Sequence, residues 1–186
     1  MWSRIQPVAL GASPDAEVNR RLEEAKEGWW KDTEMFGVIG IVPDLLKSIV
    51  PVFESFFGGG RVDAYLFELM RLKTGQANDC MYWNTVRTDA VSAQVKPREE
   101  AALSGDYDSL TRRESLAIQL AERIGKDPHS VNSGFWNTLK EEFTDEELVK
   151  MTFACSIFNW GNKFNITMQL DSDGVCYPKG MTYKET

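Results

Sequence analysis

The sequence predicts an all-α domain of about eight helices. Helix start and stop signals recur along the whole chain, whereas alternating apolar and polar runs bounded by turn residues, which mark β-strands, are short and few. The 186 residues are 42% hydrophobic and 26% charged, an ordinary balance for a folded globular chain. A chain of this length buries roughly 70% of its unfolded surface, which is enough for one sizeable core.

The first two expected helices are opened by prolines and closed by glycines. Pro14 precedes a highly charged segment that ends at Gly28, and Pro43 precedes a segment with an apolar stripe that ends at Gly58–Gly60. Proline is favourable in the first turn of a helix and glycine just beyond its last turn. Pro51 lies inside the second helix and is expected to kink it, because proline removes one backbone hydrogen bond.

The middle helices have weaker boundaries. A third helix is expected over 61–75, and a fourth from Asn78–Asp79 to about residue 94, with an Asx side chain as its cap. Pro97 is expected to open a short fifth helix, and Pro128 precedes a seventh.

Two capping boxes mark the starts of the sixth and eighth helices. They are formed by Thr111 with Glu114 and by Thr144 with Glu147. At this spacing the hydroxyl and the carboxylate satisfy backbone N–H groups that the first helical turn leaves without partners. The eighth helix is the longest and is expected to run to about Leu170.

The last helix is apolar on two sides. The first stripe consists of Leu148, Met151, Cys155 and Phe158, and the second of Phe153, Ile157, Trp160, Phe164 and Met168. A helix that is apolar all round is buried all round. We expect one stripe in the core and the other against a second subunit, which predicts a homo-oligomer. The alternative is the central core helix of a monomer.

Charge and composition exclude several classes of function. A net charge of −7 and an isoelectric point near 4.9 argue against nucleic acid as a partner. The longest apolar run, 36–42, is far below the ~20 residues that span a membrane. No signal peptide is expected. Three scattered cysteines and a single histidine, His129, predict a cytoplasmic protein without a disulfide framework, a bound metal ion or a cofactor.

The residues whose side chains are best suited to catalysis lie between Glu68 and Arg87. Cys80 should begin the fourth helix, where backbone N–H groups and the helix dipole favour a reactive thiolate. Trp83 and Arg87 should project from the same helical face. The turn before Cys80 should bring Glu68 and the Tyr82 phenol near the thiol. The alternative is an inert buried thiol beside a structural Glu68–Arg87 ion pair.

These residues resemble the signature of a known family. The pattern E-L-x-R-L, then seven residues and a cysteine, is matched by Glu68, Leu69, Arg71, Leu72 and Cys80. It is similar to E-L-x-R-L-x-x-x-x-x-x-x-C-x-x-C-x-x-x-H of the alkylhydroperoxidase D-like (AhpD-like)/carboxymuconolactone decarboxylase family. The similarity continues into the last helix, with its asparagines Asn159, Asn162 and Asn165.

The resemblance implies a homo-oligomeric, all-α AhpD-like bundle. It covers a family core over 61–170. The chain would then be a single domain over 1–186, with an N-terminal helical extension over 1–60 and a C-terminal tail over 171–186.

Two positions depart from the family signature. Trp83 stands where the second cysteine is expected, and Arg87 stands where the histidine is expected. In family members with thiol peroxidase or disulfide reductase activity, the second cysteine attacks the peroxide and the first resolves the product. Arginine cannot shuttle a proton as histidine does. The resemblance therefore implies the family fold with altered chemistry.

The implied function is that of a thiol-dependent antioxidant oxidoreductase, of the peroxidase or disulfide-reductase type, that is divergent or impaired and acts on a hydroperoxide. Catalytic roles are implied for Cys80, Glu68, Tyr82 and Arg87. A pocket is implied that is lined by Trp83, Asn159 and Asn162.

Two other functions are compatible with the same residues. One is a carboxymuconolactone-decarboxylase-like enzyme, in which Arg87 anchors a small acidic substrate, Trp83 stacks on the guanidinium, and Glu68 or Tyr82 moves a proton. The other is a non-catalytic, oligomeric small-molecule-binding protein. The remaining thiols are expected to be packed in the last helix (Cys155) and exposed in the tail (Cys176).

Overall fold

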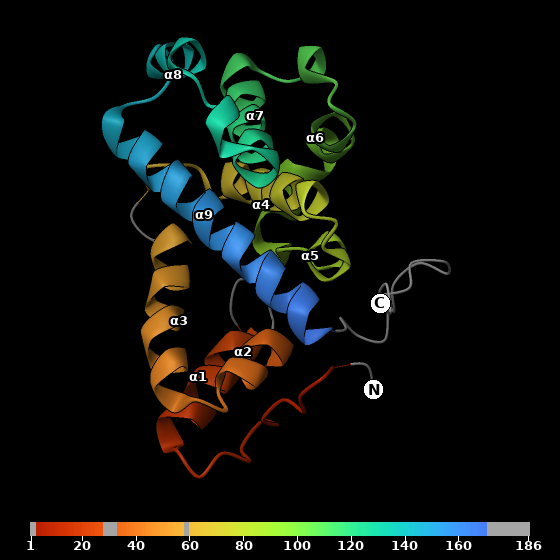
Figure 1. The fold of residues 1–186 in the computed structure, drawn as a ribbon, viewed down its shortest axis with the longest axis vertical. Helices are drawn as coiled ribbons and strands as arrows, with labels where there is room; N and C mark the ends of the chain where they lie inside the picture. Colours follow the sequence, from red (N-terminus) through yellow and green to blue (C-terminus); the bar gives the residue numbers. More distant parts are fainter. Residues whose placement is uncertain (1–2, 28–32, 58–59, 171–186) are drawn as a thin grey trace.

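The structure, a computed structural model, describes residues 3–27, 33–57 and 60–170 (Figure 1). These residues form nine α-helices and three 3-10 helices and contain no β-strand. The α-helices are, in chain order, α1 (Ala16–Glu27), α2 (Thr33–Ile39), α3 (Pro43–Phe57), α4 (Ala64–Ala77), α5 (Met81–Thr85), α6 (Ser92–Ser104), α7 (Arg112–Lys126), α8 (Ser133–Lys140) and α9 (Asp145–Met168). The predicted all-α fold is confirmed, and α2 is an addition to the predicted helices.

Helix α4 lies at the centre of the bundle. It packs against α5, α6, α7 and α9, and every residue from Leu66 to Gly75 is buried. Three of these buried residues, Glu68, Arg71 and Lys73, carry charged side chains. Because all faces of the helix are covered, these charges must find partners inside the protein.

Helix α9 crosses the molecule diagonally from α8 toward α2 (Figure 1). Its first apolar stripe is fully buried and consists of Leu148, Met151, Cys155 and Phe158. Burial raises the pKa of the Cys155 thiol to about 12, as expected of a packed cysteine. The second stripe reaches the surface, with Phe153 48% exposed and Trp160 39% exposed. One stripe therefore lies in the core, as predicted, and a subunit contact on the other remains a prediction.

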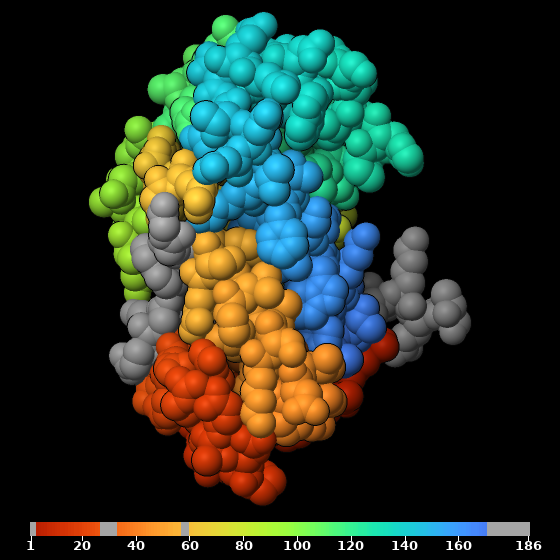
Figure 2. Space-filling view, turned by 90° about the vertical axis from the view of Figure 1, so that its left-hand side faces the viewer, coloured from red at the N-terminus to blue at the C-terminus, as the bar shows by residue number. Residues whose placement is uncertain are grey.

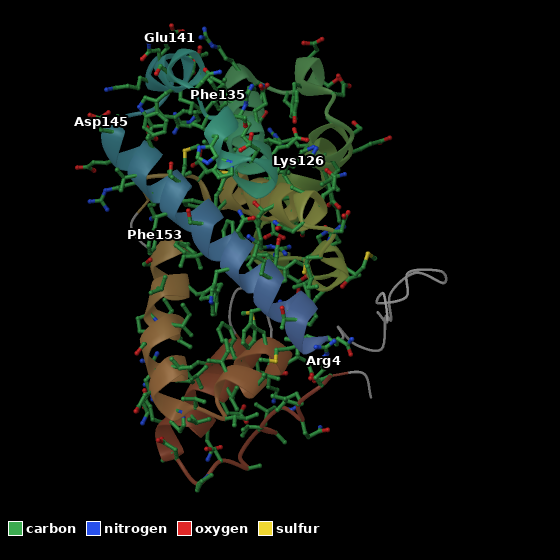
Figure 3. The ribbon with its side chains drawn as sticks, in the orientation of Figure 1. Arg4, Lys126, Phe135, Glu141, Asp145 and Phe153 are labelled. Carbon is green, nitrogen blue, oxygen red and sulfur yellow. The ribbon has the colours of Figure 1, made fainter. Side chains whose placement is uncertain are left out.

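Helices α1, α2 and α3 pack on one another at one end of the molecule (Figure 1). Aromatic rings connect them to the rest of the core. The ring centroid of Phe56 on α3 lies 6.3 Å from that of Phe67 and 5.5 Å from that of Phe158. Phe153 lies at the end of α3 (Figure 3), with its ring centroid 6.1 Å from that of Phe56. The predicted N-terminal extension thus shares a core with the segment after residue 60.

Both capping boxes form as predicted. The Thr111 N–H donates to the Glu114 carboxylate at 2.9 Å, and the Glu114 N–H donates back to the Thr111 hydroxyl at 3.3 Å. Thr144 and Glu147 repeat this arrangement at the start of α9. These local hydrogen bonds explain why the starts of α7 and α9 are readable from sequence.

The prediction of one continuous helix from 78 to about 94 is wrong. Helix α5 ends at Thr85, and Val86 is extended, with φ −73° and ψ 136°. A single 3-10 turn follows before α6 begins at Ser92. Pro97 consequently lies inside α6 rather than opening a helix of its own.

The cause of this break is a tertiary contact. The backbone carbonyls of Trp83 and Val86 accept hydrogen bonds from Arg71 of α4, at 2.9 and 2.6 Å. The Thr88 N–H donates to Glu68 of α4 at 3.1 Å. These backbone groups therefore have partners on α4 instead of partners in a continuing helix.

Two predictions lie outside the described residues. They are the exposed Cys176 in the C-terminal tail and the end of the first helix at Gly28. None of the described helices has the length and apolar character that crossing a membrane requires.

Candidate active site

Cys80 stands at the turn between α4 and α5. Helix α4 ends at Ala77, and Asp79 has a positive φ of 53° in the reversal that follows. Cys80 is the N-cap residue of α5, and its N–H donates to the Gly75 carbonyl at 2.9 Å. Its side chain is buried, at 1% exposure. Cys80 therefore precedes a helix, as expected, but the helix is one of only five residues. The predicted Asx cap is wrong, because the N-cap residue is Cys80 and the Asn78 side chain donates to the Thr74 carbonyl and to Asn159 instead.

Glu68 and Arg71 form a buried ion pair on α4 that contacts the segment after Cys80. The Arg71 Nη2 and Nε groups donate to the two carboxylate oxygens of Glu68 at 2.7 and 2.8 Å. Thr88 adds its backbone N–H at 3.1 Å and its hydroxyl at 2.9 Å to the same carboxylate. Burial alone would raise the pKa of Glu68, but the Arg71 charge and these hydrogen bonds outweigh it and lower the pKa.

The same guanidinium holds the Cys80 segment in place. Arg71 Nη1 donates to the Trp83 carbonyl, Nη2 donates to the Val86 carbonyl, and the guanidinium carbon lies 5.6 Å from the centroid of the Trp83 ring. Arg71 and Glu68 together therefore clamp both α5 and the segment after it onto α4.

Arg87 does not occupy the place that the sequence suggested. It lies beyond the end of α5, so it does not share a helical face with Cys80 and Trp83. Its Nη2 donates to Glu99 of α6 at 2.6 Å, and its Nη1 donates to the Asn84 carbonyl at 2.6 Å. The two alternatives that involved Arg87, an ion pair with Glu68 and stacking with Trp83, are both wrong, because Arg71 makes both contacts.

Trp83 packs against α9. It is 4% exposed, and its ring meets Phe158 edge-on with a centroid distance of 5.6 Å. A Cβ added at Gly161 would lie only 2.7 Å from the indole Cζ2. Glycine at 161 is therefore what allows the indole to lie directly against the α9 backbone.

A second anchor holds the other side of the Cys80 turn. The Asn78 side chain donates to the Asn159 carboxamide oxygen on α9 at 2.7 Å, and the Asn159 amide donates to the Cys155 carbonyl at 2.9 Å. Cys80 thus lies in the sequence between two residues that contact α9. Tyr82, also predicted at this site, is buried at 5% exposure.

The solved structures that resemble this chain share its fold along nearly the whole length. No protein-family model and no curated protein sequence matches it. An alkylhydroperoxidase AhpD-core, peroxidase-related protein from Ralstonia eutropha JMP134 superposes with a TM-score of 0.72 at 21% identity, with 94% of each chain covered. The chain has the AhpD-like fold.

Two further structures give the same result. The debrominase Bmp8 superposes with a TM-score of 0.75 at 16% identity over 92% of each chain, and it has also been solved in complex with 2,3,4-tribromopyrrole. A peroxidase-related protein from Silicibacter sp. TM1040 superposes with a TM-score of 0.73 at 15% identity, covering 90% of this chain and 92% of its own. At these identities the similarity establishes the AhpD-like fold of this chain.

Sequence reasoning did not assign site roles to Arg71, Thr88 and Asn165. The sequence singled out Arg71 only because it matches the arginine of the family signature. Thr88 gave no signal, because it lies outside regular helix and 20 residues from Glu68. Asn165 did give a signal, since Asn162 and Asn165 continue the helical spacing of the buried stripe that ends at Phe158.

A separate apolar groove of about 590 Å³ opens on the AhpD-like bundle along the second stripe of α9. Figure 2 shows α3 and α9 side by side on one face of the molecule. The groove is lined by Ile5, Val38, Ile39, Ile41, Val42, Leu45, Ser48, Ile49, Trp160, Phe164 and Met168. Several of these side chains are large and exposed, including Leu45 at 58% and Val42 at 49%.

Proposed function

We propose that this protein is a thiol-dependent oxidoreductase in which Cys80 is the only reacting thiol of the motif. The observation that carries the proposal is that the first motif position holds Cys80 and the second holds Trp83. Cys80 keeps the N-cap position before α5, while the position three residues later holds a tightly packed indole instead of a second thiol. An internal disulfide across the motif is therefore impossible, and in this proposal an external thiol completes the reduction.

The reaction with a hydroperoxide balances with two external thiols. The Cys80 thiolate attacks the distal peroxide oxygen, the O–O bond breaks, and the alcohol leaves after taking up a proton. Cys80 becomes a sulfenic acid, which one external thiol converts to a mixed disulfide with loss of water. A second external thiol releases Cys80 and forms the external disulfide. Cytoplasmic low-molecular-weight thiols would supply this need, so a cytoplasmic location is part of the proposal.

The surrounding residues divide between positioning and proton transfer. Glu68 accepts four hydrogen bonds, from Arg71 and Thr88, so we assign it and Arg71 to positioning the Cys80 segment. Tyr82 is the remaining candidate proton donor among the residues predicted from sequence. Arg87 is held by Glu99 and positions the loop that follows α5. With both arginines paired, the alternative of an anionic substrate has less support.

The Bmp8 comparison favours a second reaction of the same thiol, the reductive debromination of a small aromatic ring. Bmp8 is a debrominase solved with a brominated pyrrole. In such a reaction the Cys80 thiolate would take bromine from carbon, and the ring carbon would take a proton. Two external thiols would then release bromide, restore Cys80 and leave as a disulfide.

One experiment tests both reactions. The purified protein is assayed with cumene hydroperoxide and with 2,3,4-tribromopyrrole, each with dithiothreitol as the external thiol. Turnover of either substrate is expected to be lost in Cys80→Ser and kept in Cys155→Ala, the matched control at the packed thiol. Equal turnover by Cys80→Ser and the unmodified protein would refute the proposal, as would an absence of turnover with both substrates.

We also propose that the protein is a homo-oligomer that buries the groove along α9. An exposed apolar surface of this kind is typical of a protein–protein interface. It lies on the stripe that the sequence analysis assigned to a second subunit, and it includes Trp160, Phe164 and Met168.

A further inference from the structure

Two buried asparagines on α9 lack the hydrogen bonds that their burial requires. Asn162 and Asn165 are both 0% exposed, and none of their four side-chain nitrogen and oxygen atoms has a hydrogen-bond partner among the described residues. Burying such a group without a partner is unfavourable, because its hydrogen bonds to water are lost and not replaced. Asn159, one turn earlier on the same helix, has partners on both of its side-chain atoms. Among the three asparagines of this helix face, Asn162 and Asn165 therefore lack partners; the one other buried side-chain atom without a partner in the described residues is the Thr152 hydroxyl oxygen.

These two carboxamides belong to the part of α9 that faces the Cys80 turn. Asn78 contacts α9 at Asn159, and Trp83 contacts it at Phe158 and Gly161. Asn162 follows Asn159 by three residues and Phe158 by four, which places it on the same helical face as these anchors. Asn165 continues that face by one more turn. The segment from Asn78 to Trp83, with Cys80 inside it, thus crosses α9 next to Asn162.

We propose that Asn162 and Asn165 form the polar wall of a binding site beside Cys80, and that the site takes a small uncharged molecule with adjacent hydrogen-bond donor and acceptor groups. The inference rests on the proposed function in taking Cys80 as the reacting group. Each carboxamide presents two N–H donors and a carbonyl acceptor. A ligand edge that carries both kinds of group can satisfy both side chains at once, as a primary amide does.

The charge of the ligand follows from the charges nearby. The buried ion pair of Glu68 and Arg71 is closed on itself, and Arg87 is paired with Glu99. The carboxamides themselves are neutral. An ion bound against them would lose its hydration without gaining a counter-charge, which is costly inside a protein. An uncharged ligand avoids this cost.

Three molecules of nearly the same shape test the charge preference: benzamide, benzoate and benzamidinium. Each is titrated calorimetrically into the full-length protein at neutral pH. Benzamide is expected to bind about ten-fold or more tightly than either ion, since one lost hydrogen bond and an uncompensated charge together exceed the 1.4 kcal/mol that corresponds to ten-fold. A failure of benzamide to bind, or tighter binding of either ion, would overturn the proposal.

Leucine substitutions test the two side chains. Asn162→Leu and Asn165→Leu are expected to weaken benzamide binding about ten-fold each. They should leave the melting temperature of the unliganded protein unchanged or higher, because they remove buried amides that have no partner. Asn159→Leu is the matched control and should lower the melting temperature, because it breaks two hydrogen bonds. If the variants at 162 and 165 lose as much stability as Asn159→Leu, the amides serve the fold and the proposed site is wrong.

Cys80→Ser separates this inference from the proposed function. The variant should bind benzamide as the unmodified protein does, while losing thiol-dependent turnover. Benzamide binding by a protein without any turnover would refute the proposed function alone. Turnover without benzamide binding would refute the binding site alone.

Discussion

Arg71 pairs with Glu68 inside the protein, one turn away on α4, and both side chains are at most 2% exposed. This pair sets the conformation of the segment that carries Cys80, because the same guanidinium also binds the carbonyls of Trp83 and Val86. A salt bridge within one helix thereby decides where the next helix ends.

Removing one member of the buried pair should cost more than removing both. Arg71→Met leaves the Glu68 carboxylate buried without a counter-charge and should lower the free energy of unfolding by about 3–5 kcal/mol. The double variant Glu68→Gln with Arg71→Met should lose less than Arg71→Met alone. Urea denaturation of the three proteins measures the difference. A double variant that is less stable than Arg71→Met would contradict this account.

The stability of the protein should depend on the protonation of Glu68 in acid. The pKa of Glu68 in the folded state lies below its ordinary value of 4.5. Its contribution to stability is therefore complete above pH 4.5 and is lost as the pH falls through that value toward the folded-state pKa. Other carboxylates, such as Glu114 and Glu147, have lowered pKa values as well. The free energy of unfolding is therefore measured as a function of pH for both the unmodified protein and Glu68→Gln. Below pH 4.5 it should fall less steeply for Glu68→Gln.

A second cysteine should restore the redox pair of the motif. In Trp83→Cys, a disulfide to Cys80 is expected under mild oxidation, and mass spectrometry after alkylation detects it. Truncating a buried aromatic side chain costs ~3–5 kcal/mol, so the reduced variant should melt at a clearly lower temperature. Peroxidase turnover should not rise above that of the unmodified protein, because Arg87 still stands where the histidine is expected. Two thiols that remain reduced after oxidant treatment would refute the prediction.

Gly161 and Trp83 should be energetically coupled. Gly161→Ala places a Cβ 2.7 Å from the indole and should destabilise the protein by about 1–3 kcal/mol. In a Trp83→Ala background the same substitution should stabilise it by up to about 1 kcal/mol, because alanine is the better helix former. A double-mutant cycle measured by thermal unfolding tests this change of sign. Equal effects in the two backgrounds would show that the contact is not tight.

The assembly prediction concerns the second stripe of α9. Phe164→Glu places a charge in the apolar groove and should dissociate the oligomer or unfold the protein, since burying an unpaired charge is unfavourable. Sedimentation at micromolar concentration measures the change. Asn137→Glu, at an exposed position of α8 and away from the groove, is the control and should leave the assembly intact. A monomeric profile for the unmodified protein would refute the prediction.

The sequence by itself determined the features of this protein that depend on neighbours along the chain. The capping boxes at Thr111 and Thr144 and the double stripe of α9 were readable because they involve residues three or four positions apart. The all-α fold follows from such local signals, and the position of Cys80 before a helix follows from the turn at Asn78–Asp79. The buried asparagines also continue a helical spacing.

Only the tertiary structure decided which charged groups meet. The sequence analysis considered only Arg87 as a partner for Glu68, whereas in the folded chain Glu68 pairs with Arg71 and Arg87 pairs with Glu99. Arg87 is separated from Glu68 because the backbone is extended at Val86, beyond the end of α5. The tertiary structure also decided that α5 ends at Thr85, because the carbonyls of Trp83 and Val86 accept hydrogen bonds from Arg71 of α4. The partners of the Glu68 carboxylate lie up to 20 residues away from it in the chain. The choice among them depends on burial, which a local pattern does not contain.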